Sequence, residues 1–375
     1  MNENLNKKHI EPFNNLYNSY PFVKDVLKDK KHIETTKDIE KYYSKLMNQY
    51  HQQFNHSLYS NLALSEGMKI LNVGSLFGFD EKNLHYLYNN LNLKMYGIDI
   101  SKIGIYFSQS NKPAAQYAVA YAESLPFPDN CFDLVFSREV IEHVISPEDM
   151  MKEIYRVLKP GGKAVITTPN ADSLNLGHIL DKFNKKFGTH IWEPVTDYKD
   201  DHLTLKRILP AFREFKLIKR VYDGNFYFML SQFKNKKIAL AIFKLTQFIN
   251  KLPVLNRMFC DQVKYVLNKQ QNEDNSVNEI SFVEPVTMNK LDAEYFCKES
   301  NMYYFNEKLN TPDFIPEEET IETEKQDKPI LTTKCSLFQD MKDFIYFFTM
   351  FVFYILIFIT LLPISLVLKF MERLK

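Results

Sequence analysis

The sequence predicts an α/β protein with a doubly wound, mostly parallel sheet, followed by a single transmembrane helix. Strand and helix patterns alternate between residues 67 and 170, which is the order that produces a parallel sheet covered by helices. Near the C-terminus, residues 344–368 contain no charged residue. The chain of 375 residues with 45% hydrophobic content is long and apolar enough for a large core.

The α/β region opens with a predicted strand, a turn and a helix. Met68 to Val73 forms the strand, residues 74–78 form the turn, and the helix begins near Asp80. Gly74 and Gly78 have no Cβ, so the backbone of this turn can approach a nucleoside-bearing ligand closely. The pattern therefore predicts a ligand site at the end of the first strand.

The second predicted strand runs from Leu93 to Ile98 and leads directly into Asp99. A carboxylate in this place can accept hydrogen bonds from both hydroxyls of a ribose. A turn acid without a ligand is the alternative, but the position directly after the strand favours the binding role.

Residues 123–170 carry the clearest local signals of the chain. Phe132 to Ser137 predicts a short buried strand, and Ser146-Pro147 is an N-cap followed by a proline at the first helical position. Pro160-Gly161-Gly162 is expected to end the helix and turn the chain into a strand at Lys163 to Thr168. The apolar residues at helical spacing are Met150, Met151, Ile154, Val157 and Leu158.

With its LPFPDNCFD and LKPGG runs, this block closely resembles the second half of the cofactor domain of class I S-adenosylmethionine-dependent methyltransferases. The resemblance covers about residues 60–170. It implies a Rossmann-like methyltransferase fold with a seven-stranded sheet and S-adenosyl-L-methionine as cofactor, and no metal site is predicted. The cofactor-binding residues that it implies are Asn72, Gly74, Gly78, Asp99, Ile100, Ala122, Glu123 and Ser137.

Three positions depart from the pattern of that family. Asn72 and Tyr121 stand where the family usually has acids, and Leu76 stands at the middle glycine of its G-x-G-x-G turn. Ala122 and Glu123 still match, so backbone contacts to an adenine are expected. The departures motivate an alternative, a catalytically degenerate methyltransferase-like protein that serves as a binding or scaffold protein at a membrane. A dehydrogenase would need a G-x-G-x-x-G turn, which the chain lacks.

Methyl transfer from a sulfonium is a direct displacement that needs an aligned nucleophile, a dry pocket and, for some acceptors, a base. His143 and His202 are the candidate catalytic residues, and His190 and Asp201 are further candidates for acceptor contacts. The alternatives are a structural or pocket-lining role for His143 and a helix-terminal role for His202.

The near-neutral total charge conceals an uneven distribution. Residues 1–270 carry 37 Lys and Arg against 28 Asp and Glu, or +9, whereas residues 271–343 carry 7 against 17, or −10. The folded portion is therefore basic and the following segment acidic. No nucleic-acid-reading module is recognisable and the positive excess is spread out, so no nucleic-acid partner is predicted.

The uncharged segment of residues 344–368 predicts a membrane-spanning helix. A helix of 25 residues is about 37 Å long, more than the roughly 30 Å hydrocarbon core of a bilayer. A buried core helix is the alternative, but core helices rarely run so long without a polar face. The basic amphipathic helix expected at 238–250 could pack on the core or lie on an anionic membrane.

The cysteines and the N-terminus indicate the compartment. The four cysteines are far apart and the polar N-terminus lacks a secretory signal, which predicts a reducing, cytosolic location for the main domain. The protein is thus expected to be a single-pass membrane protein. The expected acceptor is a small or lipid-linked molecule, such as a lipid, a quinone precursor or a lipid-linked glycan, and no oligomeric state is predicted.

Four regions are predicted along the chain. Residues 1–66 form an N-terminal helical cover, and residues 67–270 form the methyltransferase domain. Residues 271–343 are expected to be an acidic, flexible linker, and residues 344–368 form the transmembrane helix.

Overall fold

The computed structural model describes residues 58–110, 114–173, 205–225, 251–252, 256–258 and 260–270, with short pieces between 282 and 314. The chain divides into two compact units. The first comprises Met1–Pro169, Asp200–Val221 and Lys264–Thr323, and it contains every site discussed below. The second comprises Asn170–Lys199, Tyr222–Val263 and Glu324–Lys375.

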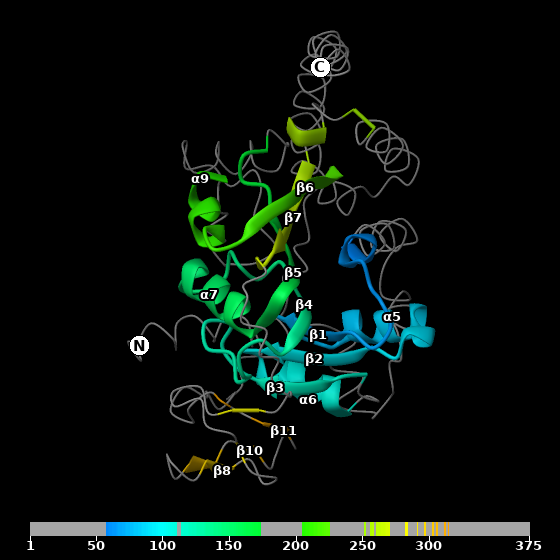
Figure 1. Cartoon of the computed structure of the whole chain (residues 1–375), viewed down its shortest axis with the longest axis vertical. Coiled ribbons are helices and arrows are strands. Elements are labelled where there is room, and N and C mark those ends of the chain that lie inside the picture. Colours follow the sequence, from blue (N-terminus) through cyan, green and yellow to red (C-terminus); the bar gives the residue numbers. More distant parts are fainter. Residues whose placement is uncertain are drawn as a thin grey trace, which may run out of the picture. The chain divides into compact units, whose positions relative to one another are not determined.

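A seven-stranded sheet organises the first unit (Figure 1). Its strand order is β3-β2-β1-β4-β5-β7-β6, and the pairs β1–β2, β1–β4, β2–β3 and β4–β5 are parallel. This confirms the predicted Rossmann-like, mostly parallel architecture. The strands are β1 Lys69–Val73, β2 Lys94–Asp99, β3 Gln116–Val119, β4 Phe132–Arg138, β5 Leu158–Pro169, β6 Lys216–Asn225 and β7 Cys260–Asn268.

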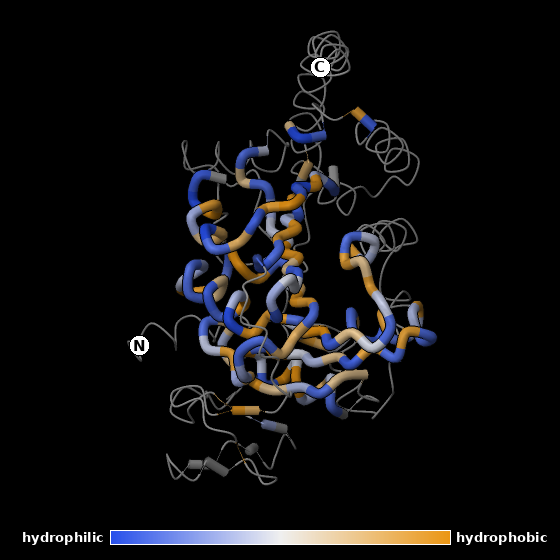
Figure 2. The backbone as a smooth tube through the Cα atoms, in the orientation of Figure 1, coloured by the Kyte–Doolittle hydropathy of each residue, from blue (hydrophilic) through white to orange (hydrophobic). Residues whose placement is uncertain are grey.

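Helices lie in the β1–β2, β2–β3, β4–β5 and β5–β6 connections. They are α5 Phe79–Leu87, η2 Asn89–Leu91, α6 Lys102–Ser110, α7 Pro147–Val157, α9 Leu205–Ile208 and η3 Leu209–Phe212. Helix α7 begins as predicted, because Ser146 Oγ accepts a hydrogen bond from Asp149 N at 3.2 Å and Pro147 occupies the first position. In Figure 2 its backbone carries both hydrophilic and hydrophobic stretches, as expected for a helix with one buried face.

The end of α7 differs from the prediction. The helix ends at Val157 and strand β5 starts at Leu158, so the Pro-Gly-Gly run lies inside the strand. Pairing with β4 extends β5 backwards, since Phe132 of β4 is the partner of Leu158. Lys269, just beyond β7, adds two hydrogen bonds, because Gly161 N donates to Lys269 O at 3.0 Å and Lys269 N donates to Gly162 O at 2.9 Å. A long-range contact therefore moves this boundary beyond the reach of local signals.

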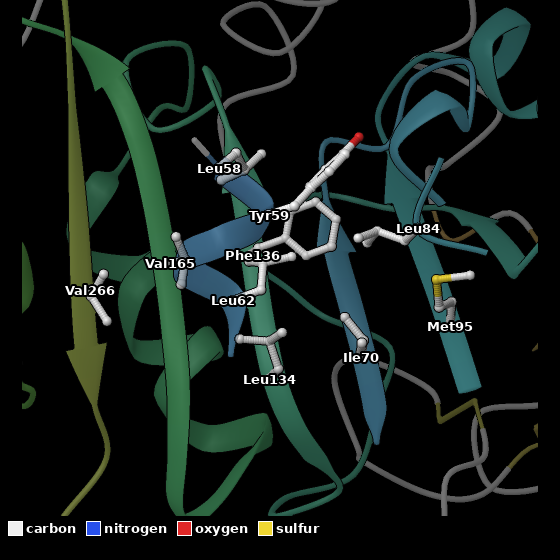
Figure 3. Packing of buried hydrophobic residues seen from close by; sticks show 10 residues of the cluster. All are labelled: Leu58, Tyr59, Leu62, Ile70, Leu84, Met95, Leu134, Phe136, Val165 and Val266. Carbon is white, nitrogen blue, oxygen red and sulfur yellow. The ribbon is translucent and has the colours of Figure 1, made fainter. Parts of the chain in front are cut away.

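A hydrophobic cluster holds the end of the predicted N-terminal cover against the sheet (Figure 3). Residues 58–62 are helical, and their buried side chains Leu58, Tyr59 and Leu62 pack over strands β1, β4 and β5. The other members of the cluster are Ile70, Leu84, Met95, Leu134, Phe136, Val165 and Val266. The rest of the predicted cover lies outside the described residues.

Parts of the segment predicted as a flexible linker make defined contacts. Phe314 N donates to Val119 O of the edge strand β3 at 2.8 Å, and Val283 N donates to Pro126 O at 3.1 Å. The Phe282 ring lies 5.2 Å from Phe127 and 5.7 Å from Phe314. Short strands lie nearby in sequence: β8 Phe296–Cys297, β9 Met302–Tyr303, β10 Phe305–Asn306 and β11 Thr311–Pro312. Apolar side chains between the acidic runs account for this difference from the prediction.

No helix in the described part of the chain is long and apolar enough to cross a membrane. The predicted helices at 238–250 and 344–368 lie outside the described residues, so both remain predictions.

Candidate active site

A pocket lies at the carboxyl ends of β1, β2, β3 and β4, where parallel strands of an open α/β sheet present their loops. It encloses about 580 Å³, counted with its open mouth. Thirteen residues line it: Gly74, Ile98, Asp99, Ile100, Ala120, Tyr121, Ala122, Glu123, Glu139, Val140, His143, Val144 and Ile145.

The turn after β1 approaches the pocket through Gly74. Gly74 has φ 88°, and a Cβ built on it would lie 2.1 Å from Val140 Cγ2. Only glycine fits a position with both a left-handed backbone and so close a neighbour. Gly74 N and Ser75 N both donate to Ile98 O, at 2.8 and 2.9 Å, which fixes the turn to β2.

Leu76, which replaces the family's middle glycine, points away from the pocket. Its side chain is not among the pocket-lining residues, and a Cβ on Gly104 of α6 would lie 3.0 Å from Leu76 Cδ1. Leu76 adopts the left-handed conformation with φ 45°, and its N–H donates to Asp99 Oδ2 at 2.9 Å. Gly104 therefore provides the room that keeps the leucine side chain out of the ligand space.

Asp99 is held in place by the backbone at the end of β2. Its Oδ1 accepts from Ser101 N at 2.7 Å and its Oδ2 accepts from Leu76 N. Burial raises the pKa of Asp99 to about 6, against the opposing effect of the backbone hydrogen bonds from Ser101 and Leu76. The group is therefore mainly ionised at neutral pH, and each oxygen keeps a lone pair for a ribose hydroxyl.

The loop after β3 forms the adjacent wall. Tyr121, Ala122 and Glu123 line the pocket, and Tyr121 also packs beside Ile105 and Val119 of the neighbouring cluster. Glu123 Oε1 accepts from the backbone N–H groups of Ile145 and Ser146, at 2.8 and 3.5 Å. Glu123 thus connects this loop to the residues that precede α7 through hydrogen bonds, in addition to its predicted role in cofactor binding.

His143 lies in the pocket, supported by a buried acid. Its Nε2 is 3.9 Å from Glu142 Oε1, and Glu142 Oε2 accepts from Thr168 Oγ1 at 3.0 Å. Glu139, which also lines the pocket, accepts from Thr167 Oγ1 at 3.0 Å. Both carboxylates are thus fixed to the end of β5 beside the one described catalytic candidate.

Five of the eight predicted cofactor residues line one pocket together with His143: Gly74, Asp99, Ile100, Ala122 and Glu123. The other three do not line it. Ser137 is fully buried in β4, Gly78 begins α5 with φ 67°, and Asn72 is buried beneath the turn. His202, His190 and Asp201 lie outside the described residues. Among the residues that the structure describes, no group of three His, Cys, Asp or Glu could hold a metal ion.

Three apolar residues of the lining were not predicted from the sequence. Val140, Val144 and Ile145 belong to the segment between β4 and α7, which folds back over the turn at Gly74. The two apolar pairs of REVIEHVIS were the available signal, but they do not show which side chains face a ligand.

Comparison with known proteins gives the class. Residues 71–166 match a family described as a methyltransferase domain. Residues 71–166 therefore form a domain of the class I S-adenosylmethionine-dependent methyltransferase type, whose cofactor is S-adenosyl-L-methionine. The matched region contains the turn after β1, Asp99 and the loops that line the pocket.

Three relatives illustrate the similarity. Phosphoethanolamine N-methyltransferase 3 of Arabidopsis thaliana is 34% identical over 110 residues, which are 28% of this chain and 22% of that protein. Tocopherol O-methyltransferase of the same organism is 32% identical over 145 residues, 35% of this chain and 41% of that protein. The mitochondrial ubiquinone biosynthesis O-methyltransferase of Rattus norvegicus is 35% identical over 140 residues, 34% and 39% respectively. The chain thus spans between about a fifth and two fifths of the length of these relatives.

Proposed function

We propose that this protein transfers a methyl group from S-adenosyl-L-methionine to an acceptor at a membrane. The observation that carries the proposal is the convergence of Gly74, Asp99, Ile100, Ala122 and Glu123 in one pocket beside His143. Residues 67–270 would form the catalytic domain, residues 271–343 the connection and residues 344–368 the membrane anchor.

The lining of the pocket fits the parts of this cofactor. Asp99 would accept hydrogen bonds from the ribose, the Tyr121–Glu123 loop would hold the adenine, and the turn at Gly74 would lie along the remainder. The cofactor supplies an electrophilic methyl group carried by a sulfonium. The carboxylates of Asp99, Glu123 and Glu139 at the wall favour a positively charged ligand.

The departures from the family pattern leave this pocket open. Leu76 packs toward Gly104, Asn72 is paired beneath the turn, and Tyr121 forms part of the wall. These placements favour an active enzyme over the alternative of a binding or scaffold protein that has lost catalysis.

His143 is proposed as the base that accepts a proton from the acceptor. It lies in the pocket, and the buried carboxylate of Glu142 stands 3.9 Å from its Nε2. A nearby carboxylate stabilises the protonated imidazole that such a step would produce.

A membrane-associated acceptor is supported by the surface at residues 206–220. Leu209, Leu217 and Ile218 are 41%, 39% and 54% exposed in this segment. Six basic residues and one acid accompany them: Lys206, Arg207, Arg213, Glu214, Lys216, Lys219 and Arg220. Exposed aliphatic side chains among positive charges suit an anionic lipid surface. Relatives named for tocopherol and for ubiquinone biosynthesis are consistent with an apolar acceptor.

The test is an assay of methyl transfer. Full-length protein in detergent micelles is incubated with methyl-labelled S-adenosylmethionine and lipid extracts of membranes, and label in an extracted product is measured. Wild type is expected to label a lipid-soluble product, and His143→Ala to lower turnover by about a hundredfold or more. The scaffold alternative would be favoured if the protein bound the cofactor but methylated no molecule in membrane extracts or among soluble metabolites.

A further inference from the structure

Glu81 and Asn72 form a buried pair beneath the cofactor turn. Asn72 lies near the end of β1 and Glu81 in the first turn of α5, and each residue is 1% exposed. Asn72 Nδ2 donates a hydrogen bond of 2.9 Å to Glu81 Oε1. Within the described part of the chain, Asn72 Oδ1 and Glu81 Oε2 have no hydrogen-bond partner. Buried acceptors without a donor are costly, so a donor is expected between them.

A proton on Glu81 would satisfy both oxygens. A carboxylic acid donates through one oxygen and accepts through the other, which complements the donor and acceptor of an amide. Burial, reinforced mainly by the charge of Asp80, raises the pKa of Glu81 to about 8, against the opposing hydrogen bonds from its own backbone N–H and from Asn72. At neutral pH the group is therefore mainly protonated and can join Asn72 through two hydrogen bonds.

The sheet leaves room for this carboxyl group at a glycine. Gly97 of β2 lies opposite Asn72 in the register of β1 and β2. A Cβ on Gly97 would lie 2.8 Å from Glu81 Oε1 and 2.9 Å from Ser75 Cβ. Ser75 belongs to the cofactor turn, so the pair and the turn pack around the same point. Any larger residue at Gly97 would displace one of them.

We propose that Glu81 is a positioning residue of the cofactor site, which together with Asn72 fixes the start of α5 and hence the turn of residues 74–78. Glu81 supplies from the helix the carboxyl group that the family usually carries at the position of Asn72. The connection is short, because Lys82 N donates to Gly78 O at 3.1 Å and Gly78 N donates to Ser75 O at 2.8 Å. The role in binding rests on the proposed cofactor site, whereas the pair itself does not.

Asp80, Asp99 and Tyr117 are ionisable groups that interact with Glu81. Asp80 is paired with Arg138 at 2.6 Å, and burial sets the pKa of Asp99 near 6. Burial holds the pKa of Tyr117, on β3, well above its usual value. A change between about pH 7 and 9 that is present in wild type and absent in Glu81→Gln is therefore assigned to Glu81.

The first test is titration of full-length protein in detergent micelles with S-adenosylhomocysteine between about pH 7 and 9. Wild-type affinity is expected to fall at least about fivefold as the pH rises through 8, because an ionised Glu81 cannot donate to Asn72. Glu81→Gln keeps a donor and an acceptor and should give a flat profile, whereas the exposed control Glu66→Gln should behave as wild type. A flat wild-type profile, or the same loss in Glu81→Gln, would overturn the proposal.

The second test needs no cofactor. The unfolding midpoint of Glu81→Gln should exceed that of wild type increasingly between about pH 5 and 8, since only wild type must keep a buried acid protonated. A constant difference across that range would overturn the protonated pair. If the pH-dependent difference appears but folded wild type binds no S-adenosylhomocysteine at pH 7, the cofactor site fails and the role of Glu81 in it fails, while the pair stands.

Discussion

At the scale of single residues, two close contacts of the turn after β1 decide which substitutions it accepts. One contact excludes a side chain, and the other leaves room for one. Gly74 is confined by Val140, whereas Leu76 has an outlet toward Gly104. The family resemblance identifies both as positions of the cofactor turn. Only the packing shows that position 74 cannot accept a side chain, whereas position 76 accepts a leucine.

Gly74→Ala should abolish or strongly weaken cofactor binding. The new Cβ would lie 2.1 Å from Val140 Cγ2 on a backbone with φ 88°, so the turn must shift. We expect S-adenosylhomocysteine affinity to fall by more than about tenfold and the free energy of unfolding by about 1–3 kcal/mol. Adding Val140→Ala removes the contacting methyl and should recover part of the stability. Wild-type binding by Gly74→Ala would contradict the described turn.

Leu76→Gly restores the family residue and should change cofactor affinity by less than about threefold, because the leucine side chain lies outside the pocket. Calorimetric titration compares it with wild type. An increase of more than about tenfold would instead mean that Leu76 obstructs the site.

Cofactor affinity should also fall on acidification through about pH 6, where the buried Asp99 becomes protonated and loses an acceptor. The pKa of Asp99 in the folded state is raised from 3.8. The free energy of unfolding therefore changes with pH in the opposite direction to that caused by a salt-bridged acid. Between about pH 4 and 6 Asp99 makes stability decrease with rising pH, and Asp99→Asn should make the slope smaller by this contribution while that of Glu81 remains. Thermal unfolding as a function of pH measures it, and an equal slope in the variant would refute the assignment.

At the scale of elements, Glu123 and Ser146 support the same helix start by different routes. Ser146 caps α7 through Asp149 N, whereas Glu123 accepts from Ile145 N while lining the pocket. Ser146→Ala should lower the free energy of unfolding by about 1 kcal/mol and leave cofactor affinity nearly unchanged. Glu123→Ala should lower both. Equal effects of the two substitutions on affinity would show that helix stability alone controls the pocket.

The elements predicted correctly are those fixed by local signals. Strands at β1, β2 and β4 and the start of α7 lie between turn and capping residues, so the sequence predicts them within a few residues. The start of β5 depends on pairing with β4 and on contacts with Lys269, and the contacts of Phe282 and Phe314 depend on distant partners. The same holds for the pocket. Asp99 could be predicted from its position directly after a strand, whereas the role of Glu81 depends on its tertiary contact with Asn72 and has no local signal.

At the scale of the whole molecule, the proposed membrane association predicts a local response to lipid charge. Hydrogen exchange of residues 206–220 is measured for full-length protein in nanodiscs of phosphatidylcholine, with and without phosphatidylglycerol. Protection should increase with the anionic lipid and be lost in Lys216→Glu/Lys219→Glu, because both side chains are exposed and positively charged. The exposed residue Tyr86 on α5 provides an internal control peptide. Equal exchange in both lipids would contradict this surface as a lipid contact.

The central claim is that the pocket at Asp99 binds the cofactor despite its altered turn. Titration of full-length protein with S-adenosylhomocysteine at pH 7, for wild type and Asp99→Ala, tests it most directly. We expect a dissociation constant of about micromolar order for wild type and a loss of at least about tenfold in the variant, since two ribose hydrogen bonds disappear. Absence of binding by folded wild type, or equal binding by the variant, would contradict it.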